Sequence, residues 1–145
     1  MPTASNVRAR TGGREIRHIT YSEAVIAARV AEMGREITAA YPVGEDLLVL
    51  GLLKGSFVFM ADLVRQIERP LHLDFAVVAS YGSGTVSSGD VKLVYDPPAV
   101  LQDKHVLLVE DIIDSGNTIN RLIPLLKERG PRSLELCALL HKHVA

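Results

Sequence analysis

The stretch VLLVEDIIDSGNT, residues 106–118, combines acidic and anion-binding features in one short segment. Three carboxylates, Glu110, Asp111 and Asp114, come after a run of apolar residues, and Ser115–Thr118 follows at the expected start of a helix. Free N–H groups and the positive end of the helix dipole make a helix start a good anion site. This segment therefore predicts a phosphate-binding loop beside a group of acids.

The acids need a different partner from the phosphate loop, because carboxylates repel a bare phosphate. A ribose diol or a hydrated Mg²⁺ on the same ligand would suit Glu110 and Asp111, and Asp114 is placed to accept a proton. A sugar phosphate offers both kinds of group. The plainer interpretation is that Asp114 and Ser115 only cap the helix while the two preceding acids are solvated.

Other classes of phosphate-binding protein fit this segment less well. The Walker sequence G-x-x-x-x-G-K-[ST] is absent, and no G-x-G-x-x-G fingerprint follows the strand. Receiver domains also place an acidic pair after an apolar strand, but there the pair belongs to the first strand. Here several elements precede the acids.

The composition is that of one ordinary domain of 145 residues, with 48% hydrophobic and 23% charged residues. A net charge of −1 and an aromatic content of 5% argue against a nucleic-acid partner. No apolar stretch reaches the length of a membrane span, and the single cysteine, Cys137, suits a reducing cytoplasm. We expect a cytoplasmic protein, with residues 1–17 as a flexible basic tail and residues 18–145 as the core domain.

Apolar runs and helical stripes alternate along the chain. Five apolar runs predict strands at 46–53, 71–80, 91–95, 104–110 and 133–140. Three helical stripes lie between them: Ile26, Val30, Met33 and Ile37; Met60, Leu63, Val64 and Ile67; Ile119, Leu122, Ile123 and Leu126. Thr20 and Glu23 predict a capping box for the first helix, and Pro124 should kink or split the third.

This alternation predicts an α/β fold with a mostly parallel, twisted sheet flanked by helices. Ligands bind beyond the carboxyl ends of the strands in such sheets. The loops at 53–56, 80–90 and 110–118 are therefore expected to converge. The glycine- and hydroxyl-rich residues 81–90 predict a flexible loop.

Three ordered motifs carry a resemblance to a known family. VLLVEDIIDSGNT resembles the phosphoribosyl-pyrophosphate (PRPP) motif of type I phosphoribosyltransferases, and its E-D-I-I-D-[ST]-G form is most similar to the hypoxanthine-guanine branch. LLKGS at 52–56 resembles the pyrophosphate loop of that branch, and SYG at 80–82 resembles the start of its flexible catalytic loop. The resemblance runs from about residue 18 to the end and implies the type I phosphoribosyltransferase fold.

The resemblance also implies a role for each motif residue. Asp114 would be the general base that faces N7 of a purine. The 5′-phosphate would be held by Asp114, Ser115, Gly116, Asn117 and Thr118. Glu110 and Asp111 would meet the ribose hydroxyls, directly or through Mg²⁺.

Two further motifs would handle the pyrophosphate. Lys54 and Gly55 would bind it, and the Leu53–Lys54 peptide is typically cis in this family. Ser80 and Tyr81 would close over it as part of the flexible catalytic loop.

The activity implied by the resemblance is purine salvage. The ribose 5-phosphate of PRPP would pass to hypoxanthine or guanine, giving IMP or GMP and pyrophosphate, with Mg²⁺ as cofactor and a homo-oligomer, dimer or tetramer, as the working form. The purine branch continues beyond the last strand with a lysine that reads the exocyclic oxygen, a base-stacking aromatic and a metal-holding aspartate. None of these is assigned here, and the chain is expected to be shortened at its C-terminus. The alternative is a non-catalytic, regulatory PRPP- or nucleotide-binding module without a complete base pocket.

Overall fold

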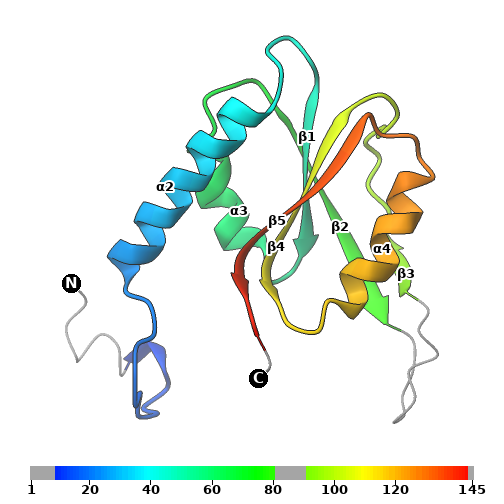
Figure 1. Cartoon of the computed structure of the whole chain (residues 1–145). Helices are drawn as coiled ribbons and strands as arrows, with labels where there is room; N and C mark the ends of the chain where they lie inside the picture. Colours follow the sequence, from blue (N-terminus) through cyan, green and yellow to red (C-terminus); the bar gives the residue numbers. More distant parts are fainter. Residues whose placement is uncertain (1–8, 81–90, 144–145) are drawn as a thin grey trace.

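A five-stranded sheet in the order β3-β2-β1-β4-β5 forms the centre of the molecule in a computed structural model that describes residues 9–80 and 91–143 (Figure 1). The strands are β1 (Leu47–Leu53), β2 (His72–Ser80), β3 (Val91–Tyr95), β4 (His105–Ile113) and β5 (Ser133–His141). β1 pairs in parallel with β2 and β4, and β4 pairs in parallel with β5. Only β3, among these strands, runs antiparallel to its neighbour. The predicted α/β fold with a mostly parallel sheet is confirmed.

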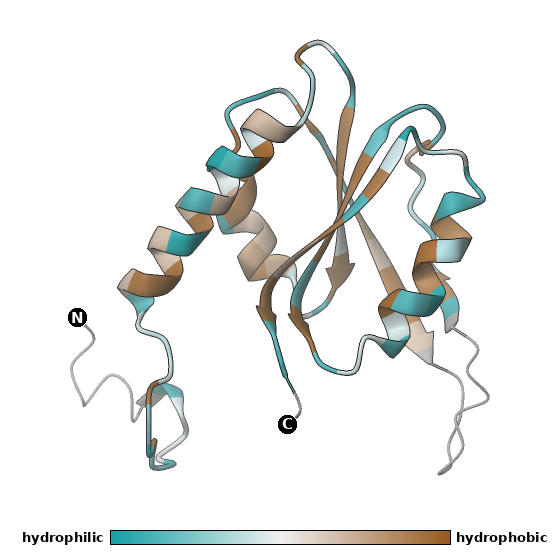
Figure 2. Cartoon of the chain, viewed as in Figure 1, coloured by the Kyte–Doolittle hydropathy of each residue, from teal (hydrophilic) through white to brown (hydrophobic). Residues whose placement is uncertain are grey.

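Helices cover both faces of the sheet, because the central strands are apolar on both sides. Helices α2 (Glu23–Ala40) and α3 (Phe57–Val64) lie on one face and α4 (Asn117–Lys127) lies on the other (Figure 1). The central strands consist mainly of hydrophobic residues (Figure 2). Val49 of β1 packs into the cluster under α2 and α3, whereas its neighbours Leu48 and Leu50 pack under α4. Within the described ranges, no helix has the length and apolar character that crossing a membrane requires.

The predicted cap of the first helix is wrong, and the third helix is not split at Pro124. The N-cap of α2 is Ser22, whose Oγ accepts a hydrogen bond from the Val25 N–H at 3.2 Å, and not Thr20. Ser22 has the extended conformation that a capping residue needs, directly before the first helical residue. Pro124 lies inside α4 without splitting it. Its missing N–H frees only the carbonyl of Asn120, an exposed residue where water can replace the lost bond.

Strand β4 is longer than its apolar run. The prediction ended this strand at Glu110, but its pairing with β5 continues through Ile112↔Leu140 and Ile113↔His141. Backbone pairing does not require apolar side chains, so the strand continues through the acids. Glu110 and Asp111 are therefore strand residues with fixed side-chain directions and do not belong to a loop.

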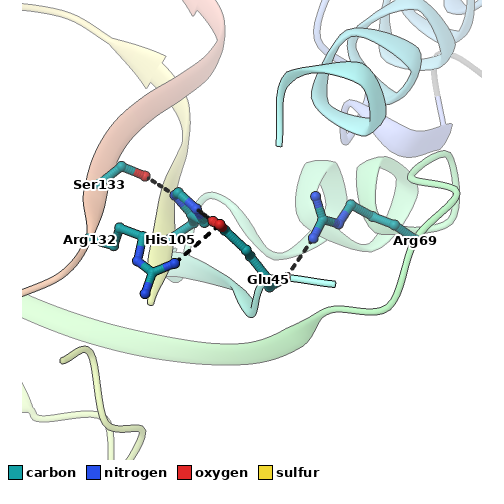
Figure 3. A network of polar contacts seen from close by, with 5 residues as sticks. All are labelled: Glu45, Arg69, His105, Arg132 and Ser133. Atoms are coloured by element: carbon teal, nitrogen blue, oxygen red, sulfur yellow. Dashed lines mark hydrogen bonds and ion pairs between the residues drawn. The ribbon is translucent and has the colours of Figure 1, made fainter. Parts of the chain in front are cut away.

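A polar network closes the amino ends of the strands (Figure 3). His105, the first residue of β4, is hydrogen-bonded through Nδ1 to the Ser133 hydroxyl at 2.6 Å and through Nε2 to the Glu45 carboxylate. Arg132 forms an ion pair with the same carboxylate at 3.2 Å, and Arg69 donates to the Glu45 backbone carbonyl at 2.7 Å. These contacts tie β4, β5 and the turn before β1 together at the sheet end opposite the predicted site.

We expect Glu45→Gln to reduce the acid sensitivity of folding. The hydrogen bond from His105 lowers the pKa of the Glu45 carboxyl below its ordinary value of 4.5. A lowered folded-state pKa stabilises the protein above the ordinary value, and this contribution is lost as the pH falls through the folded-state pKa. Urea unfolding should therefore show wild type losing stability relative to the variant from about pH 5 to about pH 3. Glu15→Gln, at an exposed position, is the control; parallel stability curves for wild type and Glu45→Gln would contradict the expectation.

Candidate active site

The carboxyl ends of β1 and β4 bring two of the predicted loops together. The strands are adjacent and parallel, so the turn with Lys54 and Gly55 lies beside the end of β4. A Cβ atom on Gly55 would lie 3.0 Å from Oδ2 of Asp111, which means that the carboxylate packs directly on the glycine. The predicted pyrophosphate loop and the predicted ribose acids therefore form one site.

The segment Ser115–Thr118 surrounds a small cavity before α4. This cavity, about 150 Å³ in volume, is lined by Glu110 and residues 112–119. Gly116 directly precedes the helix with φ 78°, in the left-handed region that favours glycine. The N-cap position has no side-chain hydrogen bond to the helix, and the Ser115 hydroxyl accepts only from the Asn117 N–H, at 3.3 Å. The other N–H groups of the first turn of α4 can receive an anion.

The simpler capping interpretation describes this site only in part. The Ser115 hydroxyl does accept from the first N–H of α4, but Asp114 makes no such hydrogen bond and lies 3.5 Å from the ammonium group of Lys142. Glu110 is partly buried and is not a freely solvated acid. Glu110 and Asp114 both line the cavity.

Glu110 and Asp111 are electrostatically coupled. Burial, and then a hydrogen bond with the Asp111 side chain, raise the pKa of Glu110 from 4.5 to about 7. The Asp111 N–H donates to Glu110 Oε1 at 3.1 Å, which orients the Glu110 side chain. A carboxyl that resists ionisation at neutral pH, next to a second acid, forms a site that a cation would stabilise.

The donor set of this pair suits Mg²⁺. Magnesium commonly keeps several water ligands and takes one or two carboxylates together with substrate phosphates. In the part of the chain that the structure describes, no cluster of three or more His, Cys, Asp or Glu side chains could form an all-protein cage. Glu110 and Asp111 therefore fit a magnesium ion that is shared with a phosphate-bearing substrate.

Lys142 is the site residue that sequence reasoning missed. HKH at 141–143 reads as a polar strand end, and nothing local connects it with the acids. In the structure the Lys142 N–H donates to the Ile113 carbonyl at 2.8 Å, so the chain after β5 continues alongside the chain after β4. This pairing places the Lys142 ammonium next to Asp114. Only the strand register, which the sequence does not reveal, could have identified the lysine.

The other predicted residues are placed as follows. The Leu53–Lys54 peptide is cis, as the resemblance implies. Ser80 is the last residue of β2, at the same end of the sheet as the other loops. Tyr81 and the rest of the predicted flexible loop lie outside the described residues.

A larger groove lies elsewhere. It has a volume of about 630 Å³ and runs between α2 and β5 over an apolar floor that includes Met33, Ile37 and Cys137. None of the predicted site residues lines it. The chemistry of the residues, and not the size of a hollow, therefore identifies the site.

Comparison with known proteins identifies the family of this chain. The family model described as the phosphoribosyl transferase domain matches residues 21–145. The chain belongs to the phosphoribosyltransferase family. It is 49% identical over 121 residues to the hypoxanthine phosphoribosyltransferase of Salmonella typhimurium, a match that covers 83% of this chain and 68% of that protein.

Further relatives of this phosphoribosyltransferase lie in the same branch. The hypoxanthine-guanine phosphoribosyltransferase of Dictyostelium discoideum is 44% identical over 129 residues, covering 87% of this chain and 72% of that protein. A crystal structure of a hypoxanthine phosphoribosyltransferase from Staphylococcus aureus superposes with a TM-score of 0.86 at 34% identity, covering 97% of this chain and 73% of that one. A Trypanosoma cruzi hypoxanthine phosphoribosyl transferase, solved to study the role of its C-terminal region in oligomeric state and activity, gives 0.80 at 35%, covering 90% and 73%.

We expect Glu110→Gln to stabilise the substrate-free enzyme at neutral and alkaline pH. A carboxyl whose folded-state pKa is raised favours folding at low pH, and this contribution is lost as the pH rises from 4.5 to about 7. Glutamine has no charge to lose and can still donate to Asp111. Because Glu110 is only partly buried, solvent screens its charge, and the gain above neutral pH is about 1 kcal/mol, or roughly 3 °C in Tm.

Thermal melts across pH, with magnesium chelated, measure this gain. Glu15→Gln, far from the site, is the matched control. A Glu110→Gln variant that melts below wild type at alkaline pH would show that the acid pair stabilises the free enzyme.

Proposed function

We propose that this phosphoribosyltransferase serves purine salvage by transferring the ribose 5-phosphate of PRPP to hypoxanthine or guanine, with IMP or GMP and pyrophosphate as products. The observation that carries the proposal is the contact between Asp111 and Gly55, since it joins the ribose acids to the pyrophosphate loop. A site that only bound a nucleotide would not need these loops in contact. The names and identities of the Salmonella and Dictyostelium relatives support the same substrates.

The phosphate groups of PRPP are held at two places. The backbone N–H groups and hydroxyls of Ser115–Thr118, at the start of α4, bind the 5′-phosphate. The exposed Lys54, together with Gly55, binds the pyrophosphate and stabilises the negative charge that builds on it as it leaves. The two loops thus fix both ends of the sugar phosphate and align the ribose carbon for attack.

Two side chains of opposite charge, Asp114 and Lys142, recognise the base. Asp114 accepts the proton of purine N7 as the glycosidic bond forms at the other ring nitrogen. Lys142, beside it, donates to the exocyclic oxygen, since N7 and the 6-oxygen lie on the same edge of a 6-oxopurine. Adenine presents an amino donor at that position and gives the ammonium nothing to bind.

Glu110 and Asp111 hold the ribose hydroxyls and Mg²⁺. When bound, magnesium neutralises part of the charge of PRPP and of the departing pyrophosphate. The raised pKa of Glu110 means that this carboxyl ionises more fully as the pH rises through neutrality, so the affinity of the site for magnesium and PRPP increases over the same range.

A turnover assay tests the proposed function. The 145-residue chain is mixed with PRPP, Mg²⁺ and one base at a time: hypoxanthine, guanine, xanthine, adenine or uracil. Turnover of hypoxanthine or guanine, with little or none of adenine and uracil, is the expected result. Binding of PRPP without turnover of any base would instead favour the non-catalytic regulatory module.

Lys142→Met is expected to weaken base selection. Loss of the ammonium should lower kcat/KM for hypoxanthine by about 10- to 100-fold, since a buried carbonyl in the complex loses its charged donor. The ratio of hypoxanthine to adenine turnover should fall with it, while the KM for PRPP changes little. Lys127→Met, at an exposed position near the end of α4, is the control. An unchanged ratio would remove Lys142 from base recognition.

We further infer a cytoplasmic homo-oligomer, dimer or tetramer. The single buried, free thiol of Cys137 suits a reducing compartment, and burial raises its pKa to about 11, so it is unreactive. The Trypanosoma cruzi relative was examined for oligomeric state, which supports assembly in this branch. Sedimentation of the purified chain decides the number of subunits.

A further inference from the structure

Ser56 is an unusual residue in this molecule. Its polar side chain is fully buried, with an exposed fraction of 0%. Its hydroxyl donates to the Leu52 carbonyl at 2.5 Å, and its own N–H reaches the same oxygen at 3.3 Å. Burying a hydroxyl is unfavourable unless it is hydrogen-bonded, so this bond is what makes serine tolerable here.

The hydrogen bond spans the loop that carries Lys54 and Gly55. Leu52 is the second-last residue of β1, and Ser56 directly precedes α3. The carbonyl of Ser56 accepts from the Met60 N–H at 2.8 Å, which anchors this residue to the first turn of the helix. The Ser56 hydroxyl therefore joins the strand end to the helix start across the residues between them.

Helix capping does not explain the hydroxyl. Ser56 is the N-cap of α3 but makes no side-chain hydrogen bond to the N–H groups of that helix. Its hydroxyl instead points back to the strand. On the other side of the loop, the Asp111 carboxylate packs against Gly55, so the loop is fixed from two directions.

We propose that Ser56 is a positioning residue for pyrophosphate binding. It does not touch the substrate; it closes the Leu52–Ser56 turn so that the backbone of Gly55 and the side chain of Lys54 face the leaving group. The inference rests on the proposed function, because it assigns Ser56 to the pyrophosphate half of the same site. It also predicts that the two halves of the site can be weakened separately.

Ser56→Ala removes the hydroxyl with almost no change in volume. We expect affinity for pyrophosphate, in the presence of Mg²⁺, to fall about fivefold, and the KM for PRPP to rise by a similar factor. Affinity for GMP should stay within about twofold of wild type, since its single phosphate occupies the separate loop at Ser115–Thr118. Isothermal titration calorimetry with pyrophosphate and with GMP measures both.

Thr38→Val is the matched control. The Thr38 hydroxyl also donates to the carbonyl four residues earlier, that of Gly34, at 2.7 Å, but it lies in α2, outside the site. Its loss should lower the melting temperature and leave pyrophosphate and GMP affinities unchanged. A melting temperature alone would not distinguish a role of Ser56 in positioning the loop from a role in stability only. The ratio of pyrophosphate to GMP affinity does distinguish them.

Each outcome of this experiment has one meaning. Wild type that binds neither pyrophosphate nor PRPP would overturn the proposed function itself. Wild type that binds both, with Ser56→Ala binding pyrophosphate equally well, would overturn only the role of Ser56. An equal loss of pyrophosphate and GMP affinity would also overturn it, since the defect would then be general. If Ser56→Ala does not fold, Ser56→Cys, which keeps the volume but is a weaker donor, is measured in the same way.

Discussion

Asp114→Asn is expected to lower kcat for hypoxanthine about 100- to 1,000-fold while leaving the protein folded. Asparagine has the shape of aspartate but cannot take the proton from N7. The ion pair with Lys142 joins two exposed side chains at 3.5 Å, so its loss should change stability by less than about 1 kcal/mol. PRPP should still bind, because the N–H groups of the α4 start remain in place. The measurement is steady-state turnover beside calorimetric PRPP binding.

A matched control separates the loss of the proton acceptor from the loss of an exposed ion pair. Asp62→Asn removes another exposed aspartate from an ion pair, with Arg65 at 2.6 Å, on the outer side of α3. It should have wild-type turnover and nearly wild-type stability. Turnover of Asp114→Asn within about threefold of wild type would mean that another group accepts the proton.

The half of the site on one continuous segment could be predicted from the sequence. Glu110 through Thr118 form a strand end, a turn and a helix start, and each step depends on local chemistry: acids, a glycine and small hydroxyl residues. The resemblance supplied roles for these residues. The structure adds what local chemistry does not determine, namely that the strand continues through the acids and that Gly116 takes a left-handed conformation.

Contacts between segments could not be predicted. The contact of Asp111 with Gly55 depends on β1 and β4 being neighbours in the sheet. The position of Lys142 beside Asp114 depends on the hydrogen bond between Lys142, directly after β5, and Ile113, the last residue of β4. Sheet order and register arise from the packing of the whole core, so the sequence predicted the strands but not which of their ends meet.

The packing of α2 against the chain that follows α3 leads to the largest expected effect on stability. Gly34 of α2 lies against Gln66, in the turn after α3: a Cβ atom on Gly34 would be 2.4 Å from Cβ, 2.5 Å from O and 2.7 Å from C of Gln66. Two of these are backbone atoms, which cannot rotate aside. Close by, the Thr38 hydroxyl donates to the Gly34 carbonyl and accepts from the Glu68 N–H at 3.0 Å, which holds this segment close to α2.

Gly34→Ala sets two effects of opposite sign against each other. Alanine in a helix interior is better than glycine by about 1 kcal/mol. Forcing a methyl group into a closed contact costs about 1–3 kcal/mol, more when backbone must move. Since the clash here is with backbone, we expect a net loss of about 2 kcal/mol, a large part of the roughly 5–15 kcal/mol that holds a domain folded. Urea unfolding measures it, with Ala28→Gly, exposed on the same helix, as the test of propensity alone. A Gly34→Ala variant more stable than wild type would mean that α2 and the turn with Gln66 separate at little cost, and that glycine is not required at this contact.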